Sequence, residues 1–550
     1  MTLHTLAISL GLAFALSSAP ATSAPKKAAF TWENATVYFL LTDRFNNGDP
    51  ANDLAYGRKA DGATLRGYMG GDLKGVTAKI REGYFNKLGV DALWITPPVE
   101  QIHASTDEGT GNSYGFHGYW AKDFTAVDAN LGTEADVREL VDTAHRHGLR
   151  VLLDVVMNHT GPVTATDPAW PAEWVRVGPT CTHKDTPTTV DCTLVKNLPD
   201  IRTDSNADVA LPPALVEKWK KEGRYEREVT ELDAFFKRTG YPRAPRFYLM
   251  KWHADWVRKF GFDGFRGDTA KHTEPGVWKD LKKVASSAYE DWKKANPRKR
   301  LGNDKFFMTA EVYNYSIHHA RKFDMGGEKF VDFFDNGFDS LINFSTAGDA
   351  KKGYEHLFGS YASALQGPLK GYSVLNYMSS HDDGSPFDPL RDKPFETATK
   401  LMLAPGSAQI YYGDETARLL KIEGAVGDAT LRSFMNWDDL TGNAQRQGYR
   451  VADVHRHWSL LGQFRKLHPA VGAGAHKQIS ASPYTFARVH AKDKVVVALD
   501  LPTDKPTAIE VGGVFRNGET VQDHYSGKRA VVRNGKVRFD ATNALVLIGR

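Results

Sequence analysis

The chain has 550 residues, of which 41% are hydrophobic, so it is long enough for two to four domains and can bury a large core. Its 70 basic and 66 acidic residues nearly balance, which excludes a strongly charged or intrinsically disordered chain and does not indicate nucleic acid or an anionic membrane as a partner. We therefore expect a globular protein, and we expect a monomer.

The N-terminus has the character of an export signal. An apolar run at residues 6–16 is followed by small residues, and the tripeptide Ala-Pro-Ala at 19–21 fits a signal-peptidase site. The run is too short to span a bilayer, and no Lys or Arg precedes it. We interpret residues 1–24 as a signal peptide and expect a protein exported to the periplasm or the medium.

The first predicted strand, Thr36 to Leu41, ends in the polar turn DRFNNGDPAND at residues 43–53, and the sequence GGD follows at 70–72. These segments crowd oxygen donors at short spacing, which suits calcium. Asn, Asp, Gly and Pro are also ordinary turn formers. From these residues alone, an ordinary turn is the preferred interpretation.

The next elements form a strand–helix–strand unit. A strand at Val90 to Ile95 is followed by the sequence HGYW at 117–120. A helix then begins at Thr133, with a capping box to Asp136, and Gly148 ends it. The apolar strand 150–156 ends in Asn158 and His159. Short links between these elements are typical of parallel βαβ structure.

The alternation stops between residues 161 and 245, a Pro-, Thr- and Asp-rich segment with the sequence LPD at 198–200. A segment this long predicts a small irregular domain inserted after the third strand. It contains both cysteines, Cys181 and Cys192. In an exported protein this spacing favours a disulfide, worth about 3 kcal/mol on the chain-entropy model. Two free thiols are the alternative.

A helix at 247–260 restores the pattern and leads to the fourth strand, Phe262 to Phe265, which ends in Arg266, Asp268, Lys271 and His272. Arg266 and Asp268 are two residues apart, so their side chains leave the strand on one side. An arginine beside a carboxylate lowers its pKa, which suits a nucleophile better than a proton donor. The alternative is a structural Arg–Asp pair.

Four further strands follow, with helical segments such as 276–295 and 396–403 between them. The strands are predicted at 306–310, 338–344, 373–377 and 408–412. Eight parallel strands alternating with helices predict an α/β protein with a (β/α)8 TIM barrel. From about residue 475, short alternating runs predict a C-terminal antiparallel β-sandwich domain. We therefore expect barrel segments at 25–160 and 246–474, an inserted B domain at 161–245 and a β domain at 475–550.

Polar residues gather at the predicted carboxyl ends of the barrel strands, where TIM barrels carry their chemistry. Besides the fourth strand, these are Asp154, Asn158 and His159 of the third, Glu311 of the fifth, and His381 and Asp382 of the seventh. Each alone could belong to a solvated rim. Together they supply the paired carboxylates of glycoside hydrolysis. Glu311 follows the apolar sequence FFMTA, so we expect burial to raise its pKa.

Six motifs resemble the α-amylase family, glycoside hydrolase family 13, and stand in that family's order. They are HGYW at 117–120, DVVMNH at 154–159, LPD at 198–200, FRGDTAKH at 265–272, Glu311 after MTA, and SHD at 380–382. The resemblance covers nearly all of the chain after the signal peptide. It implies a barrel with a B domain and a C-terminal β domain, and retaining hydrolysis of α-1,4-glucosidic bonds in starch, glycogen and maltodextrins. The nearest match is with exported bacterial α-amylases of the periplasmic type.

The resemblance also implies roles for single residues. Asp268 would be the nucleophile, Glu311 the acid/base and Asp382 the transition-state stabiliser. The sugar-binding positions at the cleavage site would be His117, Tyr119, His159, Arg266 and His381. Lys271 and His272 would lie on the leaving-group side.

Calcium is implied at two places. The family's structural site between barrel and B domain maps onto Asn158, Asp200 and the carbonyl of His272, with Asp191 as a fourth candidate ligand. The N-terminal turn is similar to a second site of the cyclodextrin glucanotransferase branch, which changes the preference stated for it above. Its ligands would be Asn47, Asp49, Asn52, Asp53, Asp72 and the carbonyl of Gly70.

Three departures bear on specificity. Ser380 stands where the family usually has Asn, which leaves the carboxylates intact. Lys196 stands where the cyclising branch carries an aromatic residue, and the chain has no room for that branch's further C-terminal domains. Both of the latter points favour hydrolysis over cyclisation. The alternatives are an exo-acting maltooligosaccharide-forming amylase, a transglycosylase, or a catalytically silent glucan-binding protein.

Overall fold

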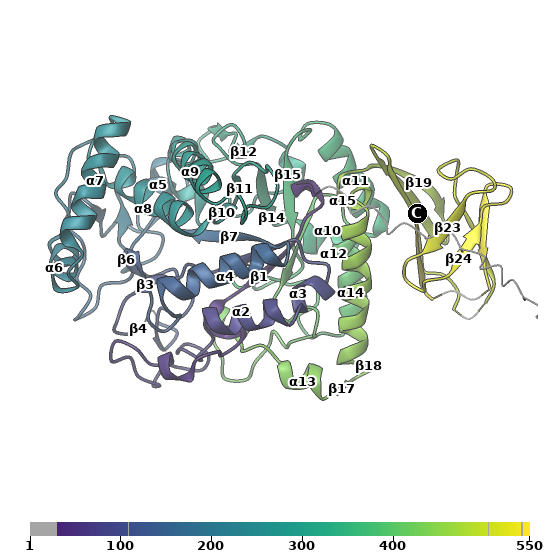
Figure 1. Ribbon diagram of the computed structural model, residues 1–550, viewed down its shortest axis with the longest axis horizontal. Helices are drawn as coiled ribbons and strands as arrows, with labels where there is room; N and C mark the ends of the chain where they lie inside the picture. Colours follow the sequence, from purple (N-terminus) through teal and green to yellow (C-terminus); the bar gives the residue numbers. More distant parts are fainter. Residues whose placement is uncertain (1–29, 108, 504, 541–542) are drawn as a thin grey trace, which may run out of the picture.

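The computed structural model describes residues 30–107, 109–503, 505–540 and 543–550, so the predicted signal peptide lies outside the described residues. Its centre is a closed barrel of parallel strands (Figure 1). In order around the barrel these are β1 (Thr36–Leu40), β2 (Ala92–Ile95), β7 (Arg150–Val155), β10 (Gly264–Gly267), β11 (Phe307–Ala310), β14 (Ser340–Asn343), β15 (Ser373–Asn376) and β16 (Ser407–Tyr411). The predicted TIM barrel is confirmed, and each strand overlaps its predicted position.

Helices alternate with these strands and cover the barrel. The longer ones are α2 (Leu73–Arg81), α4 (Glu134–Arg146), α8 (Pro245–Phe260), α9 (Pro275–Ala295), α11 (Tyr354–Gln366), α12 (Pro394–Met402) and α14 (Val451–Leu467). The shorter ones are α1 (Thr42–Phe45), α3 (Tyr84–Lys87), α10 (Thr346–Asp349), α13 (Trp437–Thr441) and α15 (Ala470–Ala473). The capping box predicted at Thr133 is confirmed, because its side chain and that of Asp136 satisfy each other's backbone N–H groups.

The connection between β11 and β14 departs from the alternation. It holds the 3-10 helix η4 (Ile317–His319) and a hairpin of β12 (Phe323–Asp324) and β13 (Phe330–Val331) where an α-helix would be expected. Gly326 and Gly327 in this hairpin have φ values of 83° and 61°. Consecutive left-handed residues are incompatible with an α-helix, so the chain turns here.

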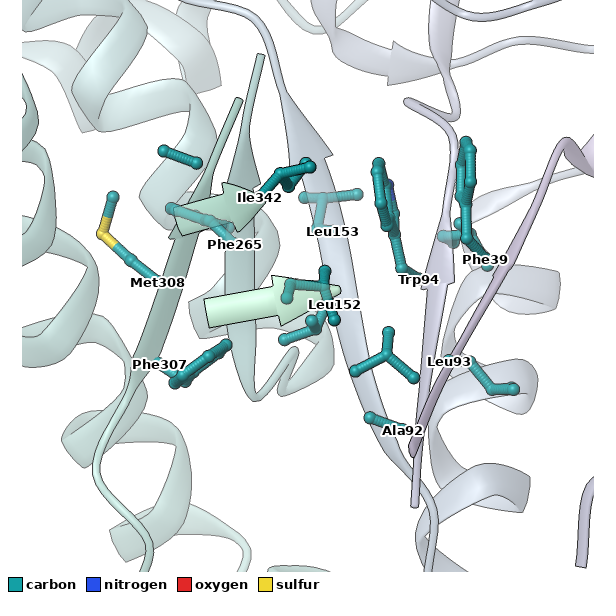
Figure 2. Packing of buried hydrophobic residues seen from close by; sticks show 14 of the residues in the cluster. Phe39, Ala92, Leu93, Trp94, Leu152, Leu153, Phe265, Phe307, Met308 and Ile342 are labelled. Atoms are coloured by element: carbon teal, nitrogen blue, oxygen red, sulfur yellow. The ribbon is translucent and has the colours of Figure 1, made fainter. Parts of the chain in front are cut away.

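Apolar side chains from neighbouring strands pack together in the barrel (Figure 2). The rings of Phe39 on β1 and Trp94 on β2 stack with centroids 3.7 Å apart, and both residues are almost fully buried. The indole Nε1 of Trp94 donates a hydrogen bond to Oδ2 of Asp154 at 2.9 Å. The packed core therefore also fixes a carboxylate at the polar end of the barrel.

Two excursions rise from the carboxyl ends of β2 and β7. The first contains β3 (Val99–Gln101), β4 (Thr106–Asp107), β5 (Asn112–Ser113) and β6 (Ala121–Val127). The second contains β8 (Val175–Arg176), α5 (Pro187–Val190), β9 (Asp200–Ile201), α6 (Pro213–Lys221) and α7 (Tyr225–Thr239). The prediction of irregular structure is wrong for α6 and α7. The helical period in α7 places Leu232, Phe235 and Phe236 on one buried face, which is the signal that was overlooked.

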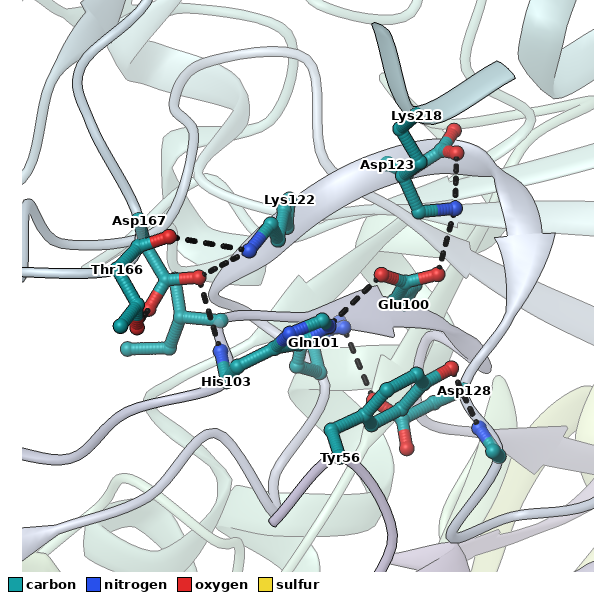
Figure 3. Close-up of polar contacts among 12 residues, drawn as sticks. Tyr56, Glu100, Gln101, His103, Lys122, Asp123, Asp128, Thr166, Asp167 and Lys218 are labelled. Atoms are coloured by element: carbon teal, nitrogen blue, oxygen red, sulfur yellow. Dashed lines mark hydrogen bonds and ion pairs between the residues drawn. The ribbon is translucent and has the colours of Figure 1, made fainter. Parts of the chain in front are cut away.

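A network of ion pairs joins the two excursions (Figure 3). Nζ of Lys218 on α6 lies 2.8 Å from Glu100 on β3 and 2.9 Å from Asp123 on β6. Farther along, Asp167 lies 2.5 Å from Nζ of Lys122 and accepts a hydrogen bond from the backbone N–H of His103. Most of these carboxylates are buried, so breaking one pair leaves an uncompensated charge. The excursions are therefore held as one unit above the barrel.

The C-terminal region consists of two antiparallel sheets. The six-stranded sheet runs β19 (Ala475–Ala481), β20 (Tyr484–His490), β21 (Asp493–Leu499), β26 (Leu545–Gly549), β23 (Thr520–Asp523) and β24 (Arg529–Val531). The two-stranded sheet pairs β22 (Thr507–Glu510) with β25 (Lys536–Phe539). Side chains of both sheets share one apolar cluster, so the predicted β-sandwich is confirmed. No helix among the described residues is both long and apolar enough to cross a bilayer.

Candidate active site

Three predicted carboxylates line one cleft of about 660 Å³ at the carboxyl end of the barrel. Asp268 follows β10 directly and Glu311 follows β11 directly, while Asp382 lies in the loop after β15. Gly267 and Ala310 are register partners, so the two carboxylates that follow them start at the same level of adjacent strands. Neighbouring strands lie about 4.8 Å apart, which brings these two residues close together.

One guanidinium connects the acidic groups. Arg266 is 1% exposed, and its Nη1 lies 2.6 Å from Oδ1 of Asp268 while its Nη2 lies 2.9 Å from Oε2 of Glu311. Its Nη1 also lies 3.1 Å from Oδ1 of Asp154. The hydroxyl of Tyr119 donates to the other oxygen of Asp154 at 2.8 Å. Asp154 thereby fixes the guanidinium on the side away from the cleft, and the guanidinium positions Asp268 and Glu311 at the cleft.

The pKa of Glu311 agrees with its prediction. Burial raises it to about 7, although Arg266 acts in the opposite direction. The pKa expected for Asp268 is wrong in direction. Burial raises the pKa of Asp268 to about 6 and outweighs the lowering by Arg266, because Asp154 and Asp382 add negative charge nearby. Glu311 therefore keeps its proton to a higher pH than Asp268 does.

Asp382 has a different environment. Its side chain is 43% exposed, so the desolvation that acts to raise its pKa is only partial, and His381 and Arg432 outweigh it and hold the pKa well below its usual range. Nε2 of His381 lies 2.9 Å from Oδ2 of Asp382, and Arg432 bonds to the other oxygen. The hydroxyl of Ser380 lies 3.3 Å from Nδ1 of the same histidine. Asp382 is therefore the carboxylate of this cleft that stays ionised over the widest pH range.

The predicted sugar-binding residues lie together, in two layers. The residues lining the cleft are His117, Tyr119, His159, Lys271 and His272, whereas Arg266 and His381 lie behind the lining. Tyr119 is central, since its backbone N–H donates to Nδ1 of His117 at 3.1 Å and its carbonyl lies 3.0 Å from Nε2 of His159. Its ring stacks between those of His117 and His381, with centroid distances of 5.7 and 5.4 Å.

Several residues of the cleft carry no motif and were not predicted. Arg432 comes from the 3-10 helix η6 (Gly427–Arg432), far along the chain from Asp382. Tyr313 is 48% exposed at the cleft, and Nζ of Lys271 lies 5.0 Å from its ring centroid. An aromatic residue two positions after Glu311 was the available signal for Tyr313. Asp154 was noted as a strand end, without a role.

The three main ligands expected for the first calcium site converge. Nδ2 of Asn158 lies 2.6 Å from Oδ1 of Asp200 and 3.3 Å from the carbonyl of His272. All three residues are buried. The side-chain amide of Asn158 thus lies between the Asp200 carboxylate and the His272 carbonyl. A cation at this place would be bound by the side-chain oxygen of Asn158, the carboxylate of Asp200 and the carbonyl oxygen of His272. These residues fit the oxygen preference of calcium.

Arg176 complicates this site, and it was not predicted. Its Nη1 lies 2.5 Å from Oδ2 of Asp200, and its Nη2 lies 3.6 Å from Asp191. Asp191 is exposed and groups with Asp204 and Glu274, with ligand atoms within 4.8 Å of one another. The structure therefore places a guanidinium against Asp200 and does not bring Asp191 into contact with Asn158.

The residues expected for the second calcium site also lie together, around the loop that ends in Asp72. Nδ2 of Asn47 donates to Oδ1 of Asp53 at 2.9 Å, and a Cβ on Gly70 would lie 2.6 Å from the same Nδ2. Oδ1 of Asn52 is buried and has no hydrogen-bond partner among the described residues. This unpaired oxygen fits a cation site. Asp49 instead pairs with Lys74 at 2.5 Å.

Cys181 and Cys192 form the predicted disulfide. The bond closes the segment that contains α5, and the carbonyl of Thr189 in α5 lies 2.9 Å from Nδ1 of His272. The disulfide thus stabilises a part of the second excursion that contacts the loop after β10. Leu194 and Leu198, just beyond it, line the cleft.

Comparisons with known proteins agree with this geometry. The family model described as "Alpha amylase, catalytic domain" matches residues 39–178. The periplasmic alpha-amylase of Escherichia coli (strain K12) is 38% identical, and the match covers 86% of this chain and 73% of that protein. A cyclomaltodextrin glucanotransferase of Paenibacillus macerans is 26% identical, with 92% of this chain and 64% of the relative covered.

Solved structures share the fold. The crystal structure of an Anoxybacillus alpha-amylase has a TM-score of 0.66 at 21% identity, covering 95% of this chain and 99% of that one. The structure of CldA, titled the first cyclomaltodextrin glucanotransferase with a three-domain ABC distribution, has a TM-score of 0.64 at 21% identity and covers 94% and 99%.

Proposed function

The chain belongs to the α-amylase family of glycoside hydrolases, and on this basis we propose that it hydrolyses internal α-1,4-glucosidic bonds of starch, glycogen and maltodextrins with retention of configuration. The observation that carries the proposal is the contact of one buried arginine, Arg266, with both Asp268 and Glu311. Retaining glycosidases need two close carboxylates, one ionised and one protonated. The higher pKa of Glu311 supports this division of roles.

In the first step, Asp268 acts as the nucleophile. One carboxylate oxygen attacks the anomeric carbon, and the bond from that carbon to the glycosidic oxygen breaks. Glu311 gives its proton to the departing oxygen, so the leaving glucan departs as a neutral alcohol. Positive charge develops on the sugar ring in the transition state, and the ionised Asp382 stabilises it. The product is a glycosyl ester of Asp268.

The second step reverses the roles. Water attacks the anomeric carbon from the side that the leaving group vacated, while the Glu311 carboxylate accepts a proton from it. The ester bond to Asp268 breaks, and its electron pair returns to the carboxylate. Two inversions give net retention, and Glu311 ends protonated, ready for another cycle. His117 and His159, which line the cleft, bind sugar hydroxyls in this scheme, and His381 holds Asp382 from behind the lining. Tyr119 lies at the cleft between the rings of His117 and His381 and contacts the sugar with its edge.

The test of these roles is Asp268→Asn. We expect hydrolysis of soluble starch, measured as reducing ends, to fall by roughly 10⁴-fold or more, while binding to starch persists. NMR of the first products of the unmutated protein should show the α anomer. Release of the β anomer, or no release of reducing sugar by the unmutated protein, would contradict the proposal.

Hydrolysis is preferred over cyclisation because of Lys196, which is exposed in the turn before the LPD motif. The number of domains does not separate the two activities, since CldA is a glucanotransferase with three domains. A three-domain arrangement is therefore compatible with either activity. Cleavage of a long maltooligosaccharide blocked at its non-reducing end distinguishes endo-hydrolysis from the exo-acting alternative, which requires a free end.

We further propose that calcium binds at both oxygen-rich sites. Asn158, Asp200 and the carbonyl of His272 would hold one ion, and the loop containing Asn47, Asn52 and Asp72 the other. The contacts of Asn158 support the first site, and the unpaired oxygen of Asn52 supports the second. Bound calcium would supply structural cross-linking at both places. Residues 1–24 would direct export, and the name of the Escherichia coli relative supports a periplasmic location.

A further inference from the structure

Two histidines and an aspartate converge outside the cleft. His318 lies in η4, Asp349 ends α10, and His356 lies in the first turn of α11, a helix on the outside of the barrel (Figure 1). Nε2 of His318 lies 2.9 Å from Oδ2 of Asp349, and Nε2 of His356 lies 3.3 Å from Oδ1. The three ligand atoms lie within 4.8 Å of one another. Each imidazole thus faces a different oxygen of one carboxylate.

We propose that His318, Asp349 and His356 form a binding site for a transition-metal ion of the Zn²⁺ class, with water completing the coordination. Two imidazole nitrogens and one carboxylate oxygen are a common three-ligand set for zinc. Bonds of about 2.0 Å at tetrahedral angles separate ligand atoms by roughly 3.3 Å. The separations of 2.9 Å for His318 and 3.3 Å for His356 are close to this value, but each joins a different oxygen of Asp349. An ion bound through one of these oxygens therefore requires a rotation of the imidazole that faces the other.

The burial of the three residues suits metal entry from solvent. Asp349 is 3% exposed, and the hydroxyl of Tyr361 donates to its Oδ2 at 2.9 Å, which fixes the carboxylate. The side chains of His318 and His356 are 41% and 39% exposed. The carboxylate of Asp349 is therefore in place before the ion binds, while the two imidazoles remain accessible from solvent.

Lys352 competes for this carboxylate. Its Nζ lies 2.9 Å from Oδ1 of Asp349, but its side chain is 58% exposed and can leave for solvent. The ammonium group is at the surface although Asp349 is buried, so a divalent ion, with its larger charge, can displace it. Removing the ammonium should therefore strengthen metal binding without disturbing the fold.

The ion would connect the cleft loop to the outer helices. η4 belongs to the segment that starts at Glu311 and includes Tyr313 and Asn314, which line the cleft. The backbone N–H of Ile317 in η4 donates to Oδ1 of Asn343 at the end of β14. A metal bridge from His318 to His356 would add a second anchor for this segment. Binding should therefore raise the melting temperature of the whole protein.

The experiment titrates Zn²⁺, as the only transition metal, into the full chain and follows binding by calorimetry. Excess calcium is present throughout to occupy the oxygen-rich sites. We expect one Zn²⁺ bound per chain at this site. The double variant His318→Gln/His356→Gln should lose it or weaken its Kd by roughly tenfold or more, whereas the control His490→Gln, an exposed histidine of the C-terminal region, should retain it.

Lys352→Gln provides a test that does not depend on removing a ligand. We expect its Kd for Zn²⁺ to fall severalfold, because Asp349 no longer shares an oxygen with an ammonium group. Equal Zn²⁺ stoichiometry and affinity in the double variant and the unmutated protein would overturn the proposal. An unchanged Kd in Lys352→Gln would likewise remove Asp349 from the ligand set, and with it the site as proposed.

Discussion

At the scale of single residues, three carboxylates share one arginine at the carboxyl end of the barrel. Arg266 contacts Asp154, Asp268 and Glu311 together. Burial raises the pKa of Asp154 and of Asp268 to about 6 and that of Glu311 to about 7. Burial, aided by the negative charges of Asp268 and Asp382, keeps Glu311 protonated near neutral pH, as an acid catalyst requires.

This arrangement makes stability depend on pH through Glu311. The pKa of Glu311 is raised from its ordinary value of 4.5 to about 7 in the folded protein, so folding disfavours the ionised form of this side chain. The stability that the neutral group contributes is complete below pH 4.5 and is lost as the pH rises through 7. Glu311→Gln does not titrate, so its stability relative to the unmutated protein should increase between pH 5 and pH 8 by up to about 3 kcal/mol.

Urea unfolding of both proteins at these two pH values measures the difference. Glu139→Gln, an exposed substitution on α4, is the control and should change stability by less than about 0.5 kcal/mol at either pH. A stability difference between Glu311→Gln and the unmutated protein that is the same at pH 5 and pH 8 would contradict the raised pKa.

Arg432 should act on the reaction through Asp382. Replacing it by Gln removes a cation that lowers the pKa of Asp382, so Asp382 will bind a proton at a higher pH. We expect kcat to fall by about 10², because a less firmly ionised Asp382 stabilises the charge on the sugar ring less well. The acidic limb of the pH profile should stay in place, because Asp268, with a pKa of about 6, sets it. Arg66→Gln removes a cleft arginine whose ion pair is with Asp428, and it should change kcat much less. An unchanged kcat in Arg432→Gln would refute this role.

At the scale of elements, the regular alternation was predictable and the excursions were less so. Strands such as β1 and β2 are almost continuous apolar runs, which are typical of strands buried on both faces, and Thr133 and Asp136 mark the start of α4 directly. The motifs at strand ends also identified Asp268, Glu311 and Asp382. Arg432 and Arg176 could not be found in this way, because each contacts a carboxylate from a loop whose path depends on tertiary packing. Likewise, the pKa of Asp268 depends on burial, which residue spacing does not reveal.

The loop at residues 46–53 and its partner at 70–72 should require calcium. A chelator should lower the melting temperature by roughly several degrees, since an ion that binds only the folded protein stabilises it by about 3–4 kcal/mol at 100 to 1,000 times its Kd. Asn52→Ala should lose part of this calcium dependence, whereas Asn206→Ala, an exposed substitution in the second excursion, should not. Identical melting curves with and without prolonged chelation would refute a calcium requirement.

At the scale of the whole molecule, the central strands β20, β21 and β26 of the six-stranded C-terminal sheet are buried on both faces. One face packs against the two-stranded sheet, while Tyr484, Phe486 and Val497 belong to the large cluster that includes the barrel helices. The carboxylate of Glu355 on α11 accepts a hydrogen bond from the hydroxyl of Tyr484 at 2.6 Å. Arg488 of β20 is fully buried and donates to the carbonyl of Leu403, after α12, at 2.6 Å. The barrel and this sheet therefore share a core.

A shared core predicts that the barrel and the C-terminal region unfold together. We expect calorimetry of the full chain to show one heat-absorption peak. A chain truncated after Gly474 exposes the apolar face that the sheet covered, so it should aggregate or melt at a much lower temperature. Glu355→Ala tests the interface more gently, and losing this partly exposed acceptor should cost about 1 kcal/mol. A truncated chain that keeps the melting temperature of the full protein would show that the two regions fold independently.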